Sequence, residues 1–185
     1  RSKLSSSSAA SDVYKRQAIT SHTGTVIVVD NNSNDRTADI AREMGAKVAF
    51  EPVNQISKAR NTGALASPQA KYLIFLDADS LLTPNLLSTT LLLLDSGKVC
   101  GGGALFKMHD NCGKIITAIW SIISTTIRLA GGGYIYCLNK AYVESGGFDE
   151  SLYAAEDVFF SRSLKRWGRK NKMKFKVITN ERVLT

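Results

Sequence analysis

The sequence has few of the residues that build disulfide frameworks or zinc sites, and it has no apolar stretch long enough for a membrane span. Only three of its 185 residues are cysteine and two are histidine, and no cysteines are spaced C-x-x-C. Three cysteines cannot all pair within one chain, which favours a reducing compartment over a disulfide scaffold. No run reaches the roughly 18 consecutive apolar residues that a spanning helix needs. His109 and Cys112 have no second ligand pair, so we expect no zinc site there.

The first residues do not resemble part of a folded domain. Residues 1–17 include the run Ser5–Ser8 and show neither helical nor strand periodicity. No apolar core follows their basic residues, so the pattern is not that of a signal peptide. We interpret this segment as a non-native leader, similar to a translated adaptor, or as a flexible tail. We expect residues 18–185, whose length suits one domain, to form the folded part.

The net charge of +8 is concentrated at the two ends of the chain. Residues 161–185 hold nine Lys and Arg against one Glu, whereas residues 18–160 hold 11 Lys and Arg against 14 acidic residues. This distribution argues against a general polyanion-binding surface and predicts no nucleic-acid partner. It indicates a local basic patch over residues 162–176, which is either a solvated face or a place of peripheral contact with anionic lipid at the inner face of a membrane.

Short apolar runs alternate with helical patterns along the chain. Val26–Val29 and Tyr72–Leu76 are continuous apolar runs that each stop at an acidic residue, as expected of strands buried on both faces. The sequence predicts further strands over Lys47–Phe50, Val99–Met108 with a kink at its three glycines, Tyr134–Leu138 and Met173–Ile178, and helices over 37–44, 57–66, 84–97, 115–128 and 156–168. This alternation predicts an α/β domain with a largely parallel sheet flanked by helices.

Acidic side chains follow two of the predicted strands. Asp30 ends the first run, and Asp77 and Asp79 follow the run Tyr72–Leu76. The carboxyl ends of parallel strands are where α/β sheets bind ligands. On an extended segment, residues two apart point roughly the same way, so Asp77 and Asp79 suit shared ligation of Mg²⁺ or Mn²⁺ together with a diphosphate.

A third acidic pair, Glu156-Asp157, opens the last predicted helix. These charges complement the helix dipole, which spacing alone favours as their role. The other interpretation makes one of them a general base that folding brings into the same cleft. The glycine run Gly131–Gly133 has two interpretations as well, a tight entry to a strand or a place where an acceptor approaches the backbone.

Five segments in order resemble family 2 glycosyltransferases, which have the GT-A fold, a Rossmann-like α/β fold. In this sequence they read VIVVDNNSNDRT, ISKARNTGA, YLIFLDADS, GGFDESLYAAED and SRSLKRWG. The resemblance implies transfer of a sugar from a nucleotide-diphosphate sugar to a hydroxyl of a saccharide or lipid-linked acceptor. It implies inversion at the anomeric carbon and use of Mg²⁺ or Mn²⁺. The reducing compartment that the cysteines favour predicts a cytoplasmic location.

The resemblance also implies a role for each matching residue. Asp157 corresponds to the general base, and Asp79 and Asp77 to the metal ligands. Glu156, Gly132 and Gly133 correspond to the acceptor side. The residues that correspond to the nucleotide-sugar site are Asp30, Asn31, Arg60, Asn61, Asp77, Arg166 and Trp167.

The chain departs from the family pattern in three places. Asn31 stands where the family often has Asp, and Lys165-Arg166-Trp167 is shorter than the motif of processive synthases, so the resemblance does not support processive polymer synthesis. In the family an opening strand and helix precede the strand that Val26–Val29 matches, whereas only Ala18–Gly24 lie between the leader and Thr25. We therefore expect a domain truncated at both ends that lacks its first βα unit.

Two other classes of function compete with this interpretation. A nucleotidyltransferase also combines an α/β fold with acidic metal ligands, but a glycine-rich basic loop is expected near its N-terminus and none is visible. A non-catalytic basic module would bind membrane or nucleic acid through residues 162–176. Salt-sensitive binding without affinity for a sugar nucleotide would favour the second alternative.

Overall fold

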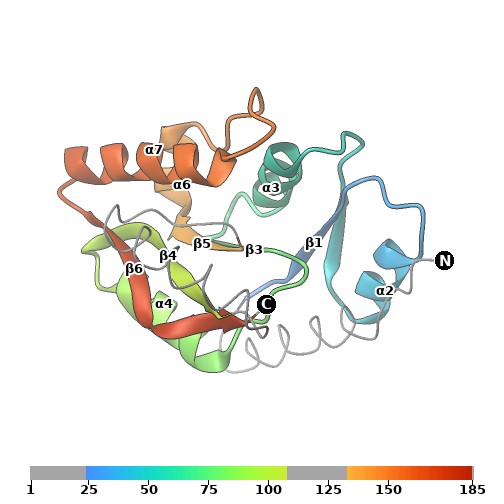
Figure 1. Cartoon of the computed structure of the whole chain (residues 1–185), viewed down its shortest axis with the longest axis horizontal. Coiled ribbons are helices and arrows are strands. Elements are labelled where there is room, and N and C mark those ends of the chain that lie inside the picture. Colours follow the sequence, from blue (N-terminus) through green and yellow to red (C-terminus); the bar gives the residue numbers. More distant parts are fainter. Residues whose placement is uncertain (1–23, 108–132, 185) are drawn as a thin grey trace.

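The computed structural model describes residues 24–107 and 133–184 (Figure 1). Along the chain the elements are β1 (Ile27–Asp30), α2 (Thr37–Glu43), β2 (Lys47–Phe50), α3 (Ile56–Leu65), β3 (Tyr72–Leu76), α4 (Pro84–Asp95), β4 (Val99–Lys107), β5 (Tyr134–Leu138), α6 (Asn139–Ser145), α7 (Glu156–Lys170) and β6 (Lys174–Leu184). The alternation of strands and helices confirms the α/β class. The helix predicted over 115–128, the leader 1–17, His109, Cys112 and Gly132 lie outside the described residues.

The strands form two sheets within the described part of the chain. β1 pairs with β2 in parallel, and the second sheet has the order β3-β5-β4-β6. In this second sheet β4 and β6 are parallel, but β5 is antiparallel to both of its neighbours. The prediction of a largely parallel sheet was therefore wrong for this half of the fold, which is mixed. A continuous apolar run such as Tyr134–Leu138 reports burial on both faces and carries no information on strand direction.

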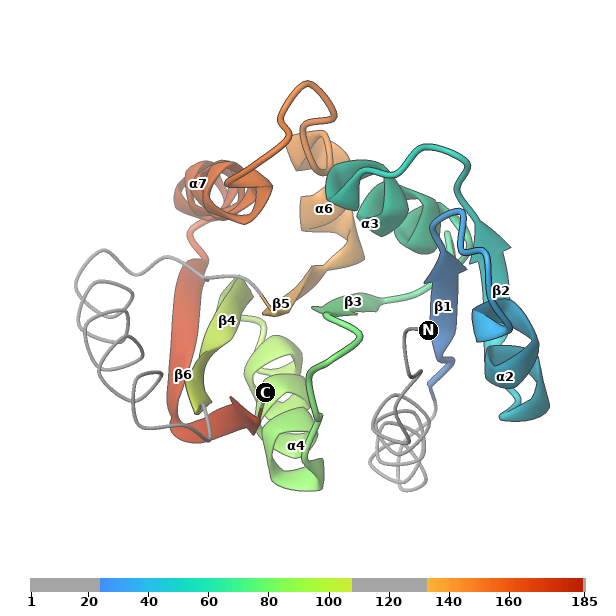
Figure 2. The ribbon, with the colours of Figure 1, turned by 45° about the vertical axis from the view of Figure 1, so that its right-hand side comes forward.

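Helices cover the second sheet on both faces. Figures 1 and 2 show α3, α6 and α7 on one side of it and α4 on the other. Side chains of β5 alternate between the two resulting cores, since Ile135 and Cys137 join the cluster under α6 and α7, and Tyr134 and Tyr136 join the cluster over α4. Burial in both directions explains why this strand is apolar at every position.

Local signals mark the start of α4 and the end of α2. Thr83 caps α4, with its Oγ1 accepting a hydrogen bond from the Leu86 N–H at 3.2 Å, and Gly45 follows α2 with φ +73°. The short helix α6 was not predicted, because seven residues hold too little apolar periodicity to stand out from a loop. β6 continues to Leu184, beyond the predicted Ile178.

Gly101 and Gly102 of β4 allow a close approach of the neighbouring strands, and the register of β4 with β6 shifts between Val99 and Gly101, where the glycine run begins. A Cβ on Gly102 would lie 1.7 Å from the Lys176 carbonyl oxygen and 2.7 Å from the Tyr136 hydroxyl oxygen. That hydroxyl donates a hydrogen bond to the same carbonyl at 2.7 Å. Gly102 therefore leaves the space in which Tyr136 reaches across to the neighbouring strand.

We expect Gly102→Ala to destabilise the domain by about 3 kcal/mol or more, because the added methyl group would overlap backbone that cannot move aside. Chemical denaturation followed by circular dichroism measures the loss. The matched control is Gly97→Ala, where the same methyl group meets no atom within 4 Å and costs only the strain of φ +67°, about 1–2 kcal/mol. Equal losses for the two variants would refute the packing argument.

Candidate active site

Two acidic segments that are far apart in the sequence meet at one arginine. Arg60 of α3 places Nη2 2.9 Å from Asp77 Oδ1, directly after β3, and Nη1 2.9 Å from Glu156 Oε1, at the start of α7. The side chains of Arg60 and Glu156 are only 11% and 10% exposed, and that of Asp77 is 43% exposed. The structure thus brings the loop Asp77-Ala78-Asp79 and the pair Glu156-Asp157 to one site.

Packing fixes the position of Arg60 between its two partners. Its guanidinium carbon lies 5.2 Å from the centre of the Phe148 ring. The beginning of α3 is tied to the segment before α7, since the Gln55 amide donates hydrogen bonds to the carbonyls of Glu150 and Leu152 at 2.7 and 3.0 Å. A planar guanidinium with fixed donors suits two carboxylates at once, whereas a lysine would offer a single point charge.

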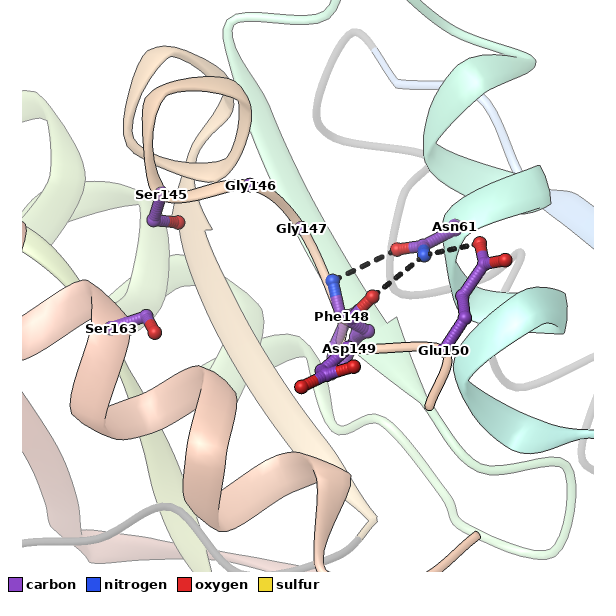
Figure 3. Close-up of a pocket in the computed structure, with 8 residues that line it drawn as sticks. All are labelled: Asn61, Ser145, Gly146, Gly147, Phe148, Asp149, Glu150 and Ser163. Atoms are coloured by element: carbon purple, nitrogen blue, oxygen red, sulfur yellow. Dashed lines mark hydrogen bonds between the residues drawn. The ribbon is translucent and has the colours of Figure 1, made fainter. Parts of the chain in front are cut away.

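Asn61, the next residue of α3, holds a glycine loop in place (Figure 3). Its Nδ2 donates to the Phe148 carbonyl at 2.9 Å and to Glu150 Oε1 at 2.8 Å. Its Oδ1 accepts from the Phe148 N–H at 3.0 Å and from the Tyr142 hydroxyl at 2.7 Å. Burial raises the pKa of Tyr142 to about 12, so this hydroxyl keeps the proton that it donates. Gly147, with φ +69°, passes so close that a Cβ there would lie 3.0 Å from Asn61 Oδ1.

A polar pocket of about 490 Å³ lies against this loop. It is lined by Asn61, Ser145, Ser163 and residues 146–150. The amide of Asn61 is hydrogen-bonded to protein at both ends, so in this structure it shapes the wall of the pocket.

The loop after β1 is also held by internal hydrogen bonds. Asp30 Oδ1 accepts from the Ser33 N–H at 3.0 Å. The Asn31 amide donates to the carbonyls of Glu51 at 3.0 Å and of Val53. A carboxylate could not donate to two carbonyls, which gives a physical reason for an amide side chain at position 31.

The residues expected to hold a metal lie at the end of β3. Asp79 is exposed, and the Asp77 N–H donates to the Gly133 carbonyl at 3.1 Å, so the last glycine of the run Gly131–Gly133 lies beside the acidic loop. No group of three or more His, Cys, Asp or Glu able to hold a metal occurs in the described residues. Two carboxylates fit Mg²⁺ or Mn²⁺ all the same, because these ions are commonly bound by one or two carboxylates together with substrate phosphates.

The two acids of the Glu156-Asp157 pair have different surroundings. Glu156 is buried against Arg60, whereas Asp157 is half-buried and its Oδ1 accepts a hydrogen bond from the Val158 N–H at 2.7 Å. Ala155, directly before α7, has φ +61°, a left-handed conformation that is strained for a residue with a side chain. Strain of this kind often occurs at functional sites.

Arg166 and Trp167 lie away from the acidic residues. Trp167 is buried in the core, and its Nε1 donates to Glu144 Oε2 at 2.8 Å, which joins α7 to α6. It follows Glu156 by eleven residues of one helix, a rise of about 16 Å. Arg166 is exposed one position earlier. The structure therefore does not bring these two residues to the Arg60 site.

Sequence reasoning missed three residues that build the site. Gln55 fixes the start of α3, Tyr142 supports Asn61, and Glu150 accepts from it. Glu150 lies within the segment GGFDESLYAAED, but nothing in that segment assigns it a partner, and no local pattern marks Tyr142. Gln55 had a weak local signal, because it is a polar residue close before a predicted helix.

We expect Asn61→Ala to destabilise the domain by about 1–3 kcal/mol, since it leaves the Phe148 backbone groups and the Tyr142 hydroxyl without their partner. Thermal unfolding measures the effect. Asn54→Ala is the matched control, because Asn54 is exposed and precedes the same helix. If the two variants had the same unfolding midpoint temperature, Asn61 would not hold the loop.

The comparisons with solved structures find glycosyltransferases of the GT-A fold. The mannosyltransferase PcManGT from Pyrobaculum calidifontis, in complex with GDP-Man and Mn²⁺, superposes with a TM-score of 0.70 at 16% identity, covering 96% of this chain and 53% of that one. Residues 1–349 of TarS from S. aureus, in complex with UDP, superpose with a TM-score of 0.67 at 15% identity, covering 97% of this chain and 57% of that one. GalNAc-T7 with UDP, GalNAc and Mn²⁺ superposes with a TM-score of 0.66 at 15% identity, covering 91% of this chain and 40% of that one.

These likenesses confirm the predicted GT-A fold, and the chain spans about half the length of the first two structures. No curated protein matches the sequence. The family model for glycosyl transferase family 2 matches residues 15–138, more than half of the chain. On this match, the chain belongs to glycosyl transferase family 2.

Proposed function

We propose that the protein transfers a sugar from a nucleotide-diphosphate sugar to a hydroxyl group of an acceptor, with inversion at the anomeric carbon. The observation that carries the proposal is the double ion pair of Arg60, which joins the acidic loop after β3 to the acidic start of α7. A transferase needs these two groups at one place, one beside the leaving diphosphate and one beside the attacking hydroxyl. The similar structures that contain GDP-Man, UDP-GlcNAc or UDP support a donor of this class.

Asp79 and Asp77 would hold Mg²⁺ or Mn²⁺ together with the diphosphate of the donor. The bound cation supplies positive charge that stabilises the leaving nucleoside diphosphate. Asp79, the more exposed of the two acids, is the one we propose for direct contact. Asp77 shares its charge with Arg60, which holds that carboxylate in one orientation.

Asp157 is the general base in this proposal. A sugar hydroxyl is a poor nucleophile, and a carboxylate within hydrogen-bond reach accepts its proton as the new bond forms. Glu156 is buried and paired with Arg60, so we assign it a supporting role on the acceptor side of the site. Asp30 and Asn31 would contact the nucleoside from the loop after β1.

A contact with an anionic membrane surface is a second part of the proposal. Seven basic side chains from the end of α7 to β6 are exposed: Arg162, Arg166, Arg169, Lys170, Lys172, Lys174 and Lys176. Such a cluster is attracted to anionic lipids and would bring a lipid-linked acceptor, on the cytoplasmic face, near the site. Among the described residues no helix is long and apolar enough to cross a bilayer. The family match gives no support to a nucleotidyltransferase.

We expect Asp79→Ala to abolish the metal-dependent part of nucleoside diphosphate binding, because the metal would lose its most accessible protein ligand. Isothermal titration with UDP and with GDP, in Mn²⁺ and in EDTA, measures it. Asp39→Ala, which removes an exposed acid on α2, should bind as the wild type does. Equal affinity in Mn²⁺ and EDTA for the unaltered protein would refute the metal site.

We expect Asp157→Asn to retain donor binding but to lose transfer by about 10²–10⁴-fold, since an amide cannot accept the proton of the acceptor. Release of nucleoside diphosphate in the presence of acceptor, measured on the full-length enzyme, reports the rate. Glu43→Gln, an exposed acid far along α2, is the control. Turnover within about threefold of the wild type would exclude Asp157 as the base.

A further inference from the structure

The turn between β2 and α3 lies against the loop after β1. The Glu51 N–H donates to the Asp30 carbonyl at 2.9 Å, directly after the last residue pair of the β1–β2 ladder. In the opposite direction, Asn31 Nδ2 donates to the Glu51 carbonyl at 3.0 Å and to the Val53 carbonyl. Both acceptors are carbonyl oxygens, so the nitrogen of this amide has to face the turn. The position of the Asn31 side chain therefore depends on the shape of residues 51–53.

The side chain of Glu51 closes this turn. Pro52 has no N–H, so the next backbone donor is the Val53 N–H, and Glu51 Oε1 accepts from it at 3.0 Å. The Val53 carbonyl also accepts from the Gln55 N–H at 2.7 Å. These two hydrogen bonds fix the backbone on both sides of Val53. They hold the carbonyls of Glu51 and Val53 where one amide nitrogen reaches both.

The second carboxylate oxygen of Glu51 ties the turn to α3. Thr62 Oγ1 donates to Glu51 Oε2 at 2.7 Å. The hydrogen bonds from Thr62 and from the Val53 N–H lower the pKa of Glu51, so the side chain is charged at neutral pH and accepts at both oxygens. Thr62 directly follows Arg60 and Asn61 in α3. Glu51 thus connects the turn that holds Asn31 to the helix that holds the acids of the site.

The loop after β1 and the acids must keep a fixed separation to bind one donor molecule. Asn31, Arg60 and Asp77 line a single cavity of about 980 Å³. In the proposed reaction the nucleoside lies against the loop after β1, and the diphosphate lies with the metal at the acids after β3. A bound molecule that spans two places binds best when both are already positioned for it.

We propose that Glu51 is a positioning residue for the nucleoside of the donor, because its carboxylate fixes the turn that holds Asn31 and ties this turn to α3. The inference rests on the proposed function, in which Asp30 and Asn31 contact the nucleoside. Glu51 acts through the Asn31 amide and needs no contact with the ligand. In the sequence it lies between the segments VIVVDNNSNDRT and ISKARNTGA, so no motif marked it.

Three substitutions separate the contributions of the Glu51 side chain. Glu51→Ala removes both acceptors. Glu51→Gln keeps an oxygen for the Val53 N–H, and its amide can donate to the Thr62 hydroxyl, which accepts as well as donates. Thr62→Val removes only the tie to α3. The matched controls are Glu43→Ala, an exposed acid on α2, and Thr89→Val, the same exchange at a half-buried position of α4.

The first measurement is the exchange of side-chain amide protons with water, followed by NMR. We expect the Asn31 protons to exchange at least about tenfold faster in Glu51→Ala, because the turn that holds them opens. The Asn61 protons donate to other partners and should exchange as in the unaltered protein, which reports that the fold is intact. Glu51→Gln should leave both pairs of protons unchanged.

The second measurement is the affinity for UDP and for GDP in Mn²⁺, by isothermal titration. For the nucleotide that the unaltered protein binds, we expect Glu51→Ala to weaken binding by about tenfold, Thr62→Val by about threefold and Glu51→Gln by about twofold or less. The two controls should bind as the unaltered protein does. If Glu51→Ala also lost the protection of Asn61, its fold would be lost, and Thr62→Val against Thr89→Val would then decide.

Unchanged Asn31 exchange or unchanged nucleotide affinity in Glu51→Ala would overturn this inference alone. A loss in Glu51→Gln as large as that in Glu51→Ala would overturn it too, since the glutamine retains the hydrogen bonds of the turn. Equal affinities for Thr62→Val and Thr89→Val would refute the tie to α3. If the unaltered protein bound neither nucleotide, the proposed function would fail together with this inference, so the two failures are distinguishable.

Discussion

The two ion pairs of Arg60 determine how the candidate site is assembled. They join α3, the end of β3 and the start of α7, and the single positive charge of Arg60 reduces the repulsion between the two carboxylates. Glu156 is almost fully covered, so loss of the arginine would leave a buried charge without a partner, which typically costs about 3–5 kcal/mol. Glu156 is thereby held in the ion pair, which is why we propose Asp157, the half-buried carboxylate beside it, for proton transfer.

Arg60 and Asn61 of α3 both position parts of the site, Arg60 through ion pairs and Asn61 through hydrogen bonds. Arg60 fixes the acids, whereas Asn61 fixes the loop before α7 through four hydrogen bonds to neutral and charged groups. The resemblance implied that both residues contact the nucleotide. Their partners in the structure are protein groups, so their first physical role is to set the shape against which a ligand would bind.

The sequence predicted the strands of this fold better than it predicted their arrangement or the partners within the site. The continuous apolar runs predicted both ends of β3 and of β5 correctly, because burial on both faces leaves no polar position within such a strand. The same runs could not report the direction of β5. The contact of Arg60 with Glu156 was not predictable either, since nothing local in either segment specifies a partner about a hundred residues away. Trp167 was placed at the nucleotide site by its motif, yet the rise of one helix separates it from Glu156.

The two sheets depend on α3 for their relative position within the described part of the chain, because no backbone hydrogen bonds join them there. Gly63 packs against Val29, and Thr62 Oγ1 donates to Glu51 Oε2 at 2.7 Å, which holds α3 to the β1–β2 sheet. Arg60 holds the same helix to β3. Side-chain contacts of this kind yield more easily than a ladder of backbone hydrogen bonds. A ligand that touches both the loop after β1 and the acids after β3 would therefore favour one relative position of the two sheets.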